Sequence, residues 1–306
     1  MPNPYEYILT DVFADRIFGG NQLAVFPFAR DFSDVSMAAI SREFKLNETV
    51  FVTGEVPGGF TLRIFSPHGE LPFAGHPLVG AASVLSSRLS DRDCARSFEL
   101  HVPAGTVPVE RVQNGGQPLF MIESPQLPCR LDQEIPISEL ASLLGLRENQ
   151  ISQSPDKAQA FSAGIPFFCI PLVDQRAVRQ AKIAEKYWHR LLESAEAPHV
   201  YVFARDCKGE IHARMFAPGV GIQEDPATGA AAVSLGRYLA SCLNMPDGYA
   251  TYIIHQGVDM GRPSRIHLKI ECSKGLLKSV KLGGTCVQYA QGTLSSDAVR
   301  FPTNKH

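Results

Sequence analysis

Short stretches of alternating apolar and polar residues recur along the chain, and turn-forming residues such as glycine and proline separate them. Such alternation is typical of β-strands that bury one face. The pattern predicts many strands joined by short connections. The clearest of them span 5–12, 49–52, 60–66, 200–204 and 211–216.

Two stretches of small and apolar residues predict helices of a different kind, over 76–87 and from 229 to about 243. Neither stretch has a clear polar face, and a helix that is apolar all round is normally buried. We therefore expect each helix to be surrounded by its own sheet. An ordinary helix is predicted to run from a suitable N-cap, Ser33, to about Phe44.

The same motif precedes both apolar helices. Arg63-Ile-Phe-Ser-Pro67 matches Arg214-Met-Phe-Ala-Pro218, and the glycines Gly75 and Gly229 then open the two helices. A repeat at half the chain length indicates two similar units, since a solenoid would need shorter periods and more copies. We expect an α+β fold of two pseudo-symmetric halves.

The predicted crossover between the halves lies after residue 124, in a proline-rich segment. We assign residues 1–124 to the N-terminal half and 125–291 to the C-terminal half. The tail, 292–306, is expected to join the first half. A chain of 306 residues is long enough for two such domains, each with its own core.

Charge and composition exclude several classes of partner. The 29 basic and 31 acidic residues give a net charge of −2, and no basic run attracts nucleic acid or an anionic membrane. No signal peptide and no apolar stretch long enough to span a bilayer are apparent. Seven widely spaced cysteines without a C-x-x-C pair are typical of reduced thiols, so we expect a cytoplasmic protein.

No standard motif for binding a nucleotide, a flavin or a metal occurs in the sequence, and no nucleophile motif of a hydrolase occurs either. We therefore expect no cofactor and no metal. The remaining possibility is acid–base chemistry by side chains, assisted by backbone dipoles.

Three side chains are candidates for this chemistry. Glu48 begins an apolar strand, where partial burial would raise the pKa of its carboxyl, as a general base requires. His76 lies at a helix N-terminus, whose dipole favours a neutral imidazole that can donate a hydrogen bond. Asp225 precedes a proline just before the second helix. The ordinary alternatives are a solvated glutamate, a structural histidine and a turn or capping aspartate.

The two helix starts are candidates for anion binding. Gly75 and Gly229 would let a ligand approach free backbone N–H groups, where the helix dipole favours negative charge. Two such starts are suited to a substrate that carries a carboxylate. Both glycines could instead serve only tight turns.

The motifs Glu70–Pro77 and Glu224–Ala231 resemble the signatures of the PhzF-like (phenazine biosynthesis-like) family. Further matching segments are Gly20–Val25, Asn47–Val52 and Gln256–Ser264. The resemblance implies a fold like that of diaminopimelate epimerase, in which each half is a mixed, β-barrel-like sheet wrapped around a central helix. It also implies a site between the halves, no cofactor and a homodimer.

The best understood activity of that family is isomerisation of a cyclic dihydro-hydroxyanthranilate in phenazine biosynthesis. Glu48 matches the glutamate that moves a proton between carbons. His76 and Asp225 match residues that hold the substrate, while the backbone at Gly75 and Gly229 matches the part that holds its carboxylate.

The chain departs from the family patterns at three positions. The related epimerases carry a cysteine before each motif glycine, where this chain has Ala74 and Thr228, so thiol-based racemisation is not expected. The phenazine enzymes carry a serine where this chain has Ala230, a position expected to line the substrate site. The substrate therefore need not be the phenazine precursor.

We expect a cofactor-independent isomerase that acts on a small carboxylated metabolite, cyclic or unsaturated. Two alternatives remain open. One is an epimerase in which Glu48 and Asp225 serve opposite faces of a carbon, and the other is a non-catalytic module that binds a metabolite or a protein. The repeated Arg63 and Arg214 are expected to form structural ion pairs.

Overall fold

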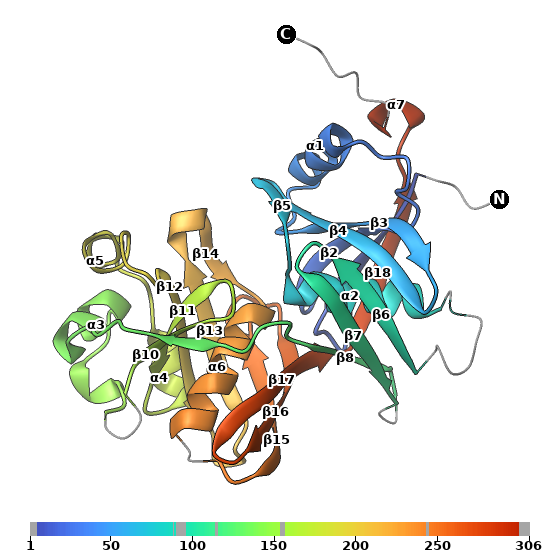
Figure 1. The fold of residues 1–306 in the computed structure, drawn as a ribbon. Coiled ribbons are helices and arrows are strands. Elements are labelled where there is room, and N and C mark those ends of the chain that lie inside the picture. The colour runs from blue at the N-terminus through green and yellow to red at the C-terminus, as the bar shows by residue number, and fades with distance from the viewer. Residues whose placement is uncertain are drawn as a thin grey trace. The chain divides into compact units, whose positions relative to one another are not determined.

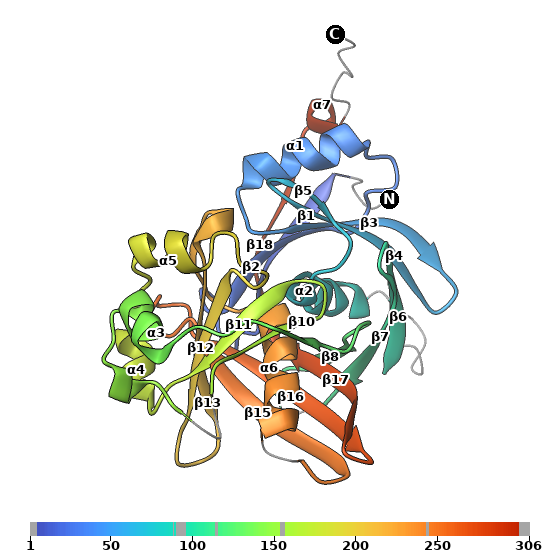
Figure 2. The same ribbon diagram turned by 60° about the vertical axis from the view of Figure 1, so that its left-hand side comes forward.

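The computed structural model describes residues 5–87, 89, 96–113, 116–153, 157–242 and 245–299. The chain forms two units (Figures 1 and 2). The N-terminal unit contains residues 1–125 and 283–306, and the C-terminal unit contains residues 126–282. Each unit combines a mixed sheet with a few helices, which confirms the expected α+β fold class.

In the N-terminal unit, the described residues form the strands β1 (Glu6–Val12), β2 (Asn21–Phe26), β3 (Thr49–Val56), β4 (Gly59–Ser66), β5 (Gly69–Leu71), β6 (Ser97–Val102), β7 (Gly105–Val112), β8 (Leu119–Glu123) and β18 (Cys286–Thr293). Two helical crossovers produce parallel pairs. Helix α1 (Asp34–Phe44) joins β2 to β3, and α2 (Gly75–Ser86) joins β4 to β6. The pairs β1–β2, β3–β4, β6–β7, β7–β8 and β1–β18 are antiparallel.

The strands of the C-terminal unit are β9 (Cys129–Leu131), β10 (Gln159–Ser162), β11 (Pro166–Pro171), β12 (His199–Arg205), β13 (Ile211–Ala217), β14 (Ile222–Asp225), β15 (Gly248–Gln256), β16 (Ser264–Ser273) and β17 (Leu276–Gly284). Helices α4 (Gln175–Gln180) and α5 (Glu185–Leu191) lie between the parallel strands β11 and β12. Helix α6 (Gly229–Cys242) lies between the parallel strands β13 and β15. The short helix α3 (Ile137–Leu144) contacts α5.

The sequence repeat is therefore a repeat of topology. In the N-terminal unit, the hairpin β3–β4 is followed by β5, α2 and the hairpin β6–β7. In the C-terminal unit, the hairpin β12–β13 is followed by β14, α6 and the hairpin β15–β16. Both parallel pairs are joined through the central helix.

The two central helices are buried, as their composition predicts. Every residue of α2 from Gly75 to Leu85 is buried except Ser83, and α6 has a buried run from Ala231 to Gly236. Gly80 shows how closely α2 meets its sheet. A Cβ at this position would lie 2.4 Å from Leu23 and 2.7 Å from Val12, so a larger residue does not fit without repacking.

The helices on the crossovers cover separate parts of the core. Ser33 caps α1 as predicted, because its side chain accepts a hydrogen bond from the backbone N–H of Ser36 (3.1 Å). Beneath α1 lies an aromatic cluster of Phe26, Phe32, Phe51 and Phe65. In the C-terminal unit, α3, α4 and α5 enclose a second apolar cluster around the buried Trp188.

Strand β18 joins the end of the chain to its beginning. It pairs along β1 from Glu6↔Thr293 to Val12↔Cys286, so residues from 283 onward belong to the N-terminal unit. The sequence pattern indicated no strand here and assigned only 292–306 to that half. A short helix, α7 (Ser296–Val299), follows β18, and the end of the tail is outside the described residues.

Candidate active site

Glu48 and His76 meet within the N-terminal unit. Glu48 directly precedes β3, and His76 is the second residue of α2. Oε2 of Glu48 lies 3.1 Å from Nε2 of His76, at contact distance but without the alignment of a hydrogen bond. The side chains are 18% and 7% exposed, respectively. Part of the Glu48 side chain is therefore exposed, whereas the two atoms that face each other, Oε2 of Glu48 and Nε2 of His76, are buried.

Burial determines the charge of His76. It lowers the pKa of the imidazole to about 3 from the usual value of 6.5. The N-terminus of α2 also disfavours a cation at this position. The carboxylate of Glu48 would favour protonation, but an imidazole removed from water loses more hydration energy than a single neighbouring charge restores. His76 is therefore a neutral side chain at physiological pH.

The second group of candidates lies at the turn between β14 and α6 in the C-terminal unit. Asp225 ends β14 and is 5% exposed. The hydroxyl of Thr228 donates a hydrogen bond of 2.5 Å to Oδ2 of Asp225. Gly229 then opens α6, with Ala230 half-buried in its first turn.

A buried glutamine holds this turn from the neighbouring strand. Gln256, which ends β15 and has no exposed surface, donates to the backbone carbonyl of Asp225 (2.8 Å) and to the hydroxyl of Thr228 (2.9 Å). The hydroxyl of Tyr201 on β12 donates to the amide oxygen of Gln256 (3.2 Å). At Gly257, φ is +70°, and a Cβ would lie 2.6 Å from the carbonyl oxygen of Pro226. This contact requires glycine.

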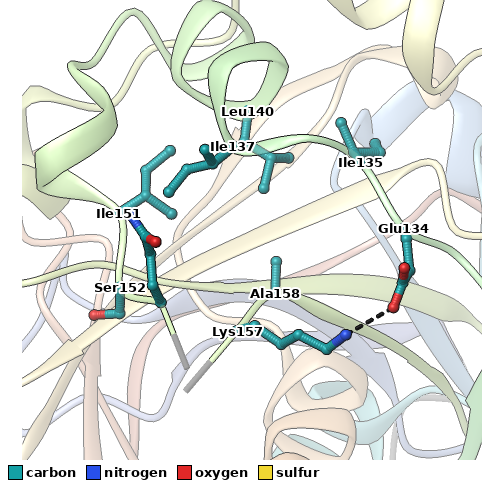
Figure 3. A pocket seen from close by; sticks show the side chains of 9 residues that line it. Glu134, Ile135, Ile137, Leu140, Ile151, Ser152, Lys157 and Ala158 are labelled. Carbon is teal, nitrogen blue, oxygen red and sulfur yellow. Dashed lines mark hydrogen bonds and ion pairs between the residues drawn. The ribbon is translucent and has the colours of Figure 1, made fainter. Parts of the chain in front are cut away.

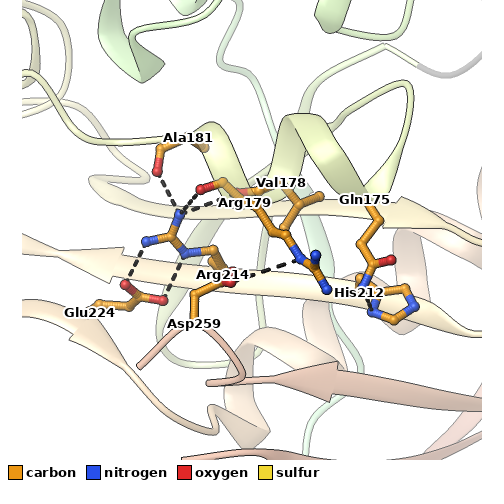
Figure 4. A network of polar contacts seen from close by, with 8 residues as sticks. All are labelled: Gln175, Val178, Arg179, Ala181, His212, Arg214, Glu224 and Asp259. Atoms are coloured by element: carbon orange, nitrogen blue, oxygen red, sulfur yellow. Dashed lines mark hydrogen bonds and ion pairs between the residues drawn. The ribbon is translucent and has the colours of Figure 1, made fainter. Parts of the chain in front are cut away.

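The two repeated arginines make equivalent ion pairs. Nε and Nη2 of Arg63 on β4 contact the two carboxylate oxygens of Glu70 on β5, at 2.8 and 2.6 Å. Arg214 on β13 binds Glu224 on β14 in the same way, at 2.8 and 2.7 Å (Figure 4). Such paired contacts fix geometry well. The predicted structural pairing is confirmed, and the absence of a catalytic role stays a prediction.

Each arginine also anchors a crossover helix. Nη1 of Arg214 donates to the backbone carbonyls at the end of α4, those of Val178, Arg179 and Ala181, at 3.2, 3.1 and 2.7 Å (Figure 4). The last carbonyls of a helix have few backbone partners of their own, so a cation there stabilises the C-terminus of α4. Arg63 instead contacts Asp34, the first residue of α1. The arginines therefore tie the strands before each site motif to the outer helices.

The start of α2 has the features expected for an anion-binding site. Its N-cap residue, Ala74, makes no side-chain hydrogen bond to the first backbone N–H groups. Gly75, the first helical residue, is buried. Uncapped N–H groups and the helix dipole together favour a carboxylate. For the start of α6, the corresponding role of Gly229 and Ala230 stays a prediction.

Two surface pockets lie away from all of these residues. One, of about 280 Å³ in the C-terminal unit, has an apolar wall that includes Ile137 and Leu140, and an ion pair between Lys157 and Glu134 (2.7 Å) lies at its side (Figure 3). The other, of about 270 Å³, lies in the N-terminal unit near Phe28 and Glu55. Neither is lined by a predicted site residue.

Within the described part of the chain, no group of three or more His, Cys, Asp and Glu side chains could hold a metal ion. Among the same residues, no helix has the length and apolar character needed to cross a bilayer.

The structure brings together some of the predicted residues. Glu48 and His76 form one group, beside Gly75, and Asp225 belongs with Gly229 and Ala230 in another. The sequence reading missed the roles of Gln256 and Tyr201. The segment Gln256–Ser264 was recognised as similar to the family, but the buried amide at its start could be identified only through its partners.

Comparison with known proteins identifies the family. A family model described as phenazine biosynthesis-like protein (PhzC-PhzF) matches residues 10–292. A protein of Mesorhizobium japonicum described as an uncharacterized isomerase is 33% identical over 297 residues, covering 94% of this chain and 98% of its own length. The trans-2,3-dihydro-3-hydroxyanthranilate isomerase of Pseudomonas aeruginosa is 32% identical over 296 residues, covering 94% and 98%.

A solved structure agrees in fold. The crystal structure of a PhzF-family phenazine biosynthesis protein from Bacillus anthracis matches with a TM-score of 0.84 at 22% identity, covering 96% of this chain and all of the other. The match of the family model over nearly the whole chain, together with these relatives, leads to one conclusion: this protein is a member of the phenazine biosynthesis-like (PhzC-PhzF) family.

Proposed function

We propose that the protein is a cofactor-independent isomerase that moves a proton between two carbons of a small carboxylated metabolite, cyclic or unsaturated. The observation that carries the proposal is the contact of 3.1 Å between the Glu48 carboxylate and the buried, neutral His76. A partly buried carboxylate can serve as the base that removes a proton from carbon. Relatives named as isomerases support the reaction class.

Glu48 acts as the base that takes a proton from one carbon and returns it to another. Such a step needs a positioned acid–base group, which contributes about 10²- to 10⁴-fold to the rate. His76 is uncharged at neutral pH, so it binds the substrate by a hydrogen bond and not as a cation. Asp225 binds a polar group of the substrate.

The helix starts stabilise the charge that develops during the reaction. Removing a proton next to a conjugated carboxylate spreads negative charge onto the carboxylate oxygens. Backbone N–H groups at Gly75 and Gly229 are suited to bind those oxygens, and fixed dipoles of this kind stabilise a transition state without having to reorient.

A relative of 32% identity is named as an isomerase of trans-2,3-dihydro-3-hydroxyanthranilate. The substrate of this protein resembles that compound in carrying a carboxylate on an unsaturated ring. Ala230 removes a hydroxyl that the phenazine enzymes have at this position. We therefore expect the best substrate of this protein to differ from that compound at the group nearest Ala230.

Exchange of hydrogen for deuterium tests the proposal directly. The protein is incubated in D₂O with a panel of cyclic carboxylates that includes trans-2,3-dihydro-3-hydroxyanthranilate, and deuterium uptake is followed by mass spectrometry. One deuterium should enter the substrate. Glu48→Gln keeps the shape of the side chain but removes the base, so uptake should fall at least about 100-fold while ligand affinity stays within a few-fold.

The same experiment distinguishes the alternatives. A Glu48→Gln variant with the wild-type rate would contradict the role of Glu48. Deuterium entering a single stereocentre with inversion, and loss of this exchange in Asp225→Asn, would indicate an epimerase that uses two carboxylates. Binding without any exchange would indicate a metabolite-binding module.

A further inference from the structure

We infer that Gln256 is a positioning residue: it fixes the direction of the hydroxyl proton of Thr228, so that Asp225 meets the substrate as an ionised hydrogen-bond acceptor. This inference rests on the proposed binding role of Asp225 and extends it to the chemistry of the substrate. An ionised acceptor recognises an amine, an ammonium or a hydroxyl group, so the substrate must carry such a donor besides its carboxylate.

The orientation of the Gln256 amide follows from its two backbone partners. The N–H of Thr228, which can only donate, lies 3.4 Å from the amide oxygen. The carbonyl of Asp225, which can only accept, lies 2.8 Å from the amide nitrogen. Reversing the amide would set donor against donor and acceptor against acceptor. Only one orientation satisfies both contacts.

Tyr201 supports this orientation from the other side. Its hydroxyl lies 3.2 Å from the amide oxygen of Gln256, and neither side chain has exposed surface. Burial raises the pKa of Tyr201 well above its usual value, with the nearby Cys169 and Asp225 adding to the effect. The phenol therefore keeps its proton and donates it to the amide oxygen.

The direction of the next hydrogen bond follows. The amide nitrogen of Gln256 donates to the hydroxyl of Thr228 at 2.9 Å, so that oxygen acts as an acceptor there. A hydroxyl has one proton, and the remaining partner is Oδ2 of Asp225 at 2.5 Å. With the hydroxyl proton directed at it, Oδ2 is the acceptor of this bond, and the short distance is that of a hydroxyl bound to a charged carboxylate.

A purely structural role and a positioning role require different properties of the Gln256 side chain. Holding the turn requires only a side chain of the right size, whereas setting the proton direction requires an N–H₂ group that faces Thr228. Gln256→Glu separates the two roles, because it keeps the size and replaces the donor by an acceptor. The hydroxyl of Thr228 would then turn towards residue 256, and two carboxylates would share the turn.

Carbon-13 NMR of protein labelled at its aspartate carboxyls tests the inference without a substrate. The signal of Asp225 is identified by its loss in Asp225→Asn. At pH 7 we expect the chemical shift of an ionised carboxylate in the wild type and in the matched control Thr228→Ser. In Gln256→Glu the signal should move towards that of a protonated carboxyl. A protonated Asp225 in the wild type, or an unchanged signal in Gln256→Glu, would overturn the inference.

A second pair of variants covers the case in which Gln256→Glu does not fold. Thr228→Val removes the hydroxyl at nearly constant size, and Thr228→Ser retains it. If the wild type binds trans-2,3-dihydro-3-hydroxyanthranilate, calorimetry should show at least about tenfold weaker binding for Thr228→Val and near wild-type binding for Thr228→Ser. Equal affinity of both variants would overturn the inference.

These measurements also separate two kinds of failure. Absence of deuterium exchange in the wild type would contradict the proposed isomerase, while the NMR signal of Asp225 still decides the role of Gln256. Conversely, an active enzyme whose Asp225 signal is unaffected by Gln256→Glu would retain the proposed function and reject the positioning role.

Discussion

At the scale of single residues, His76 shows how burial can outweigh a neighbouring charge. A solvated histidine beside a carboxylate would normally have a raised pKa. His76 has a pKa lowered to about 3, because its side chain is almost completely removed from water. The protein thereby keeps a neutral hydrogen-bonding group next to the carboxylate of Glu48.

We predict that His76 makes the folded state sensitive to acid. Between pH 6.5 and 3 the unfolded chain takes up a proton at this residue and the folded protein does not, so protonation favours unfolding. The contribution of His76 to stability is complete above pH 6.5 and decreases as the pH falls. From the two pKa values, the loss amounts to about 2 kcal/mol at pH 5.

The measurement is the free energy of unfolding in urea at pH 7 and pH 5, for the wild type and His76→Asn. Asparagine fills a similar space and does not titrate, so the drop between the two pH values should be about 2 kcal/mol smaller in the variant. Equal drops in both proteins would show that His76 does not titrate as the structure indicates.

At the scale of elements, the two central helices differ in how much space they leave for a side chain at a buried glycine. Gly80 in α2 touches the sheet so closely that a Cβ would approach two core side chains within 2.7 Å. Gly236 in α6 is less confined, since a Cβ there would lie 3.1 Å from Val280 and at least 3.6 Å from other atoms. The helices therefore offer a matched pair of substitutions.

Gly80→Ala should destabilise the protein and Gly236→Ala should not. Overpacking at Gly80 costs about 1–3 kcal/mol, which exceeds the gain of about 1 kcal/mol from the better helix propensity of alanine. At Gly236 the gain in helix propensity is the same, and the only cost is a tight contact with Val280 that a small shift of this side chain relieves. Differential scanning calorimetry should show a lower Tm for the first variant, and equal Tm values for both would contradict this account of the packing.

At the scale of the whole molecule, the N-terminal unit depends on the end of the chain. Strand β18 pairs with β1 over its full length, so this unit needs residues that are synthesised after the whole C-terminal unit. Without β18, an edge of β1 would be left with unpaired backbone groups, and such edges promote aggregation.

A chain that ends at residue 284 should have a less stable N-terminal unit, whereas one that ends at residue 295 should keep its stability. The shorter chain lacks the seven residue pairs between β1 and β18. At about 0.5 kcal/mol for the hydrogen bonding of each lost pair, the loss is about 3.5 kcal/mol. Its Tm should fall by about 10 °C or the protein should aggregate. A shorter chain that melts like the longer one would contradict this dependence.

The sequence alone predicted the repeated topology and the central helix of each unit. The repeat of Arg63–Pro67 in Arg214–Pro218 predicted two units of the same topology, and the apolar composition of α2 and α6 predicted that both helices are central. These features depend on local pattern: strand alternation, helix burial and capping are set by residues close together in the chain. The cap at Ser33 is an example.

The strand β18 could not be predicted in the same way. Its residues carry no clear apolar alternation, and half of them are exposed. It is a strand because β1, at the other end of the chain, supplies its hydrogen-bonding partners. Pairing between distant segments overrides weak local preference.

The same distinction between sequence and tertiary structure applies to the candidate site. Residue type and motif were enough to select Glu48, His76 and Asp225 as candidates. Only the tertiary structure joined Gln256 and Tyr201 to the turn at Asp225, and only burial determined the charge of His76. The physical reason is that a buried polar group is defined by its partners and its distance from water, and both arise when segments far apart in the sequence pack together.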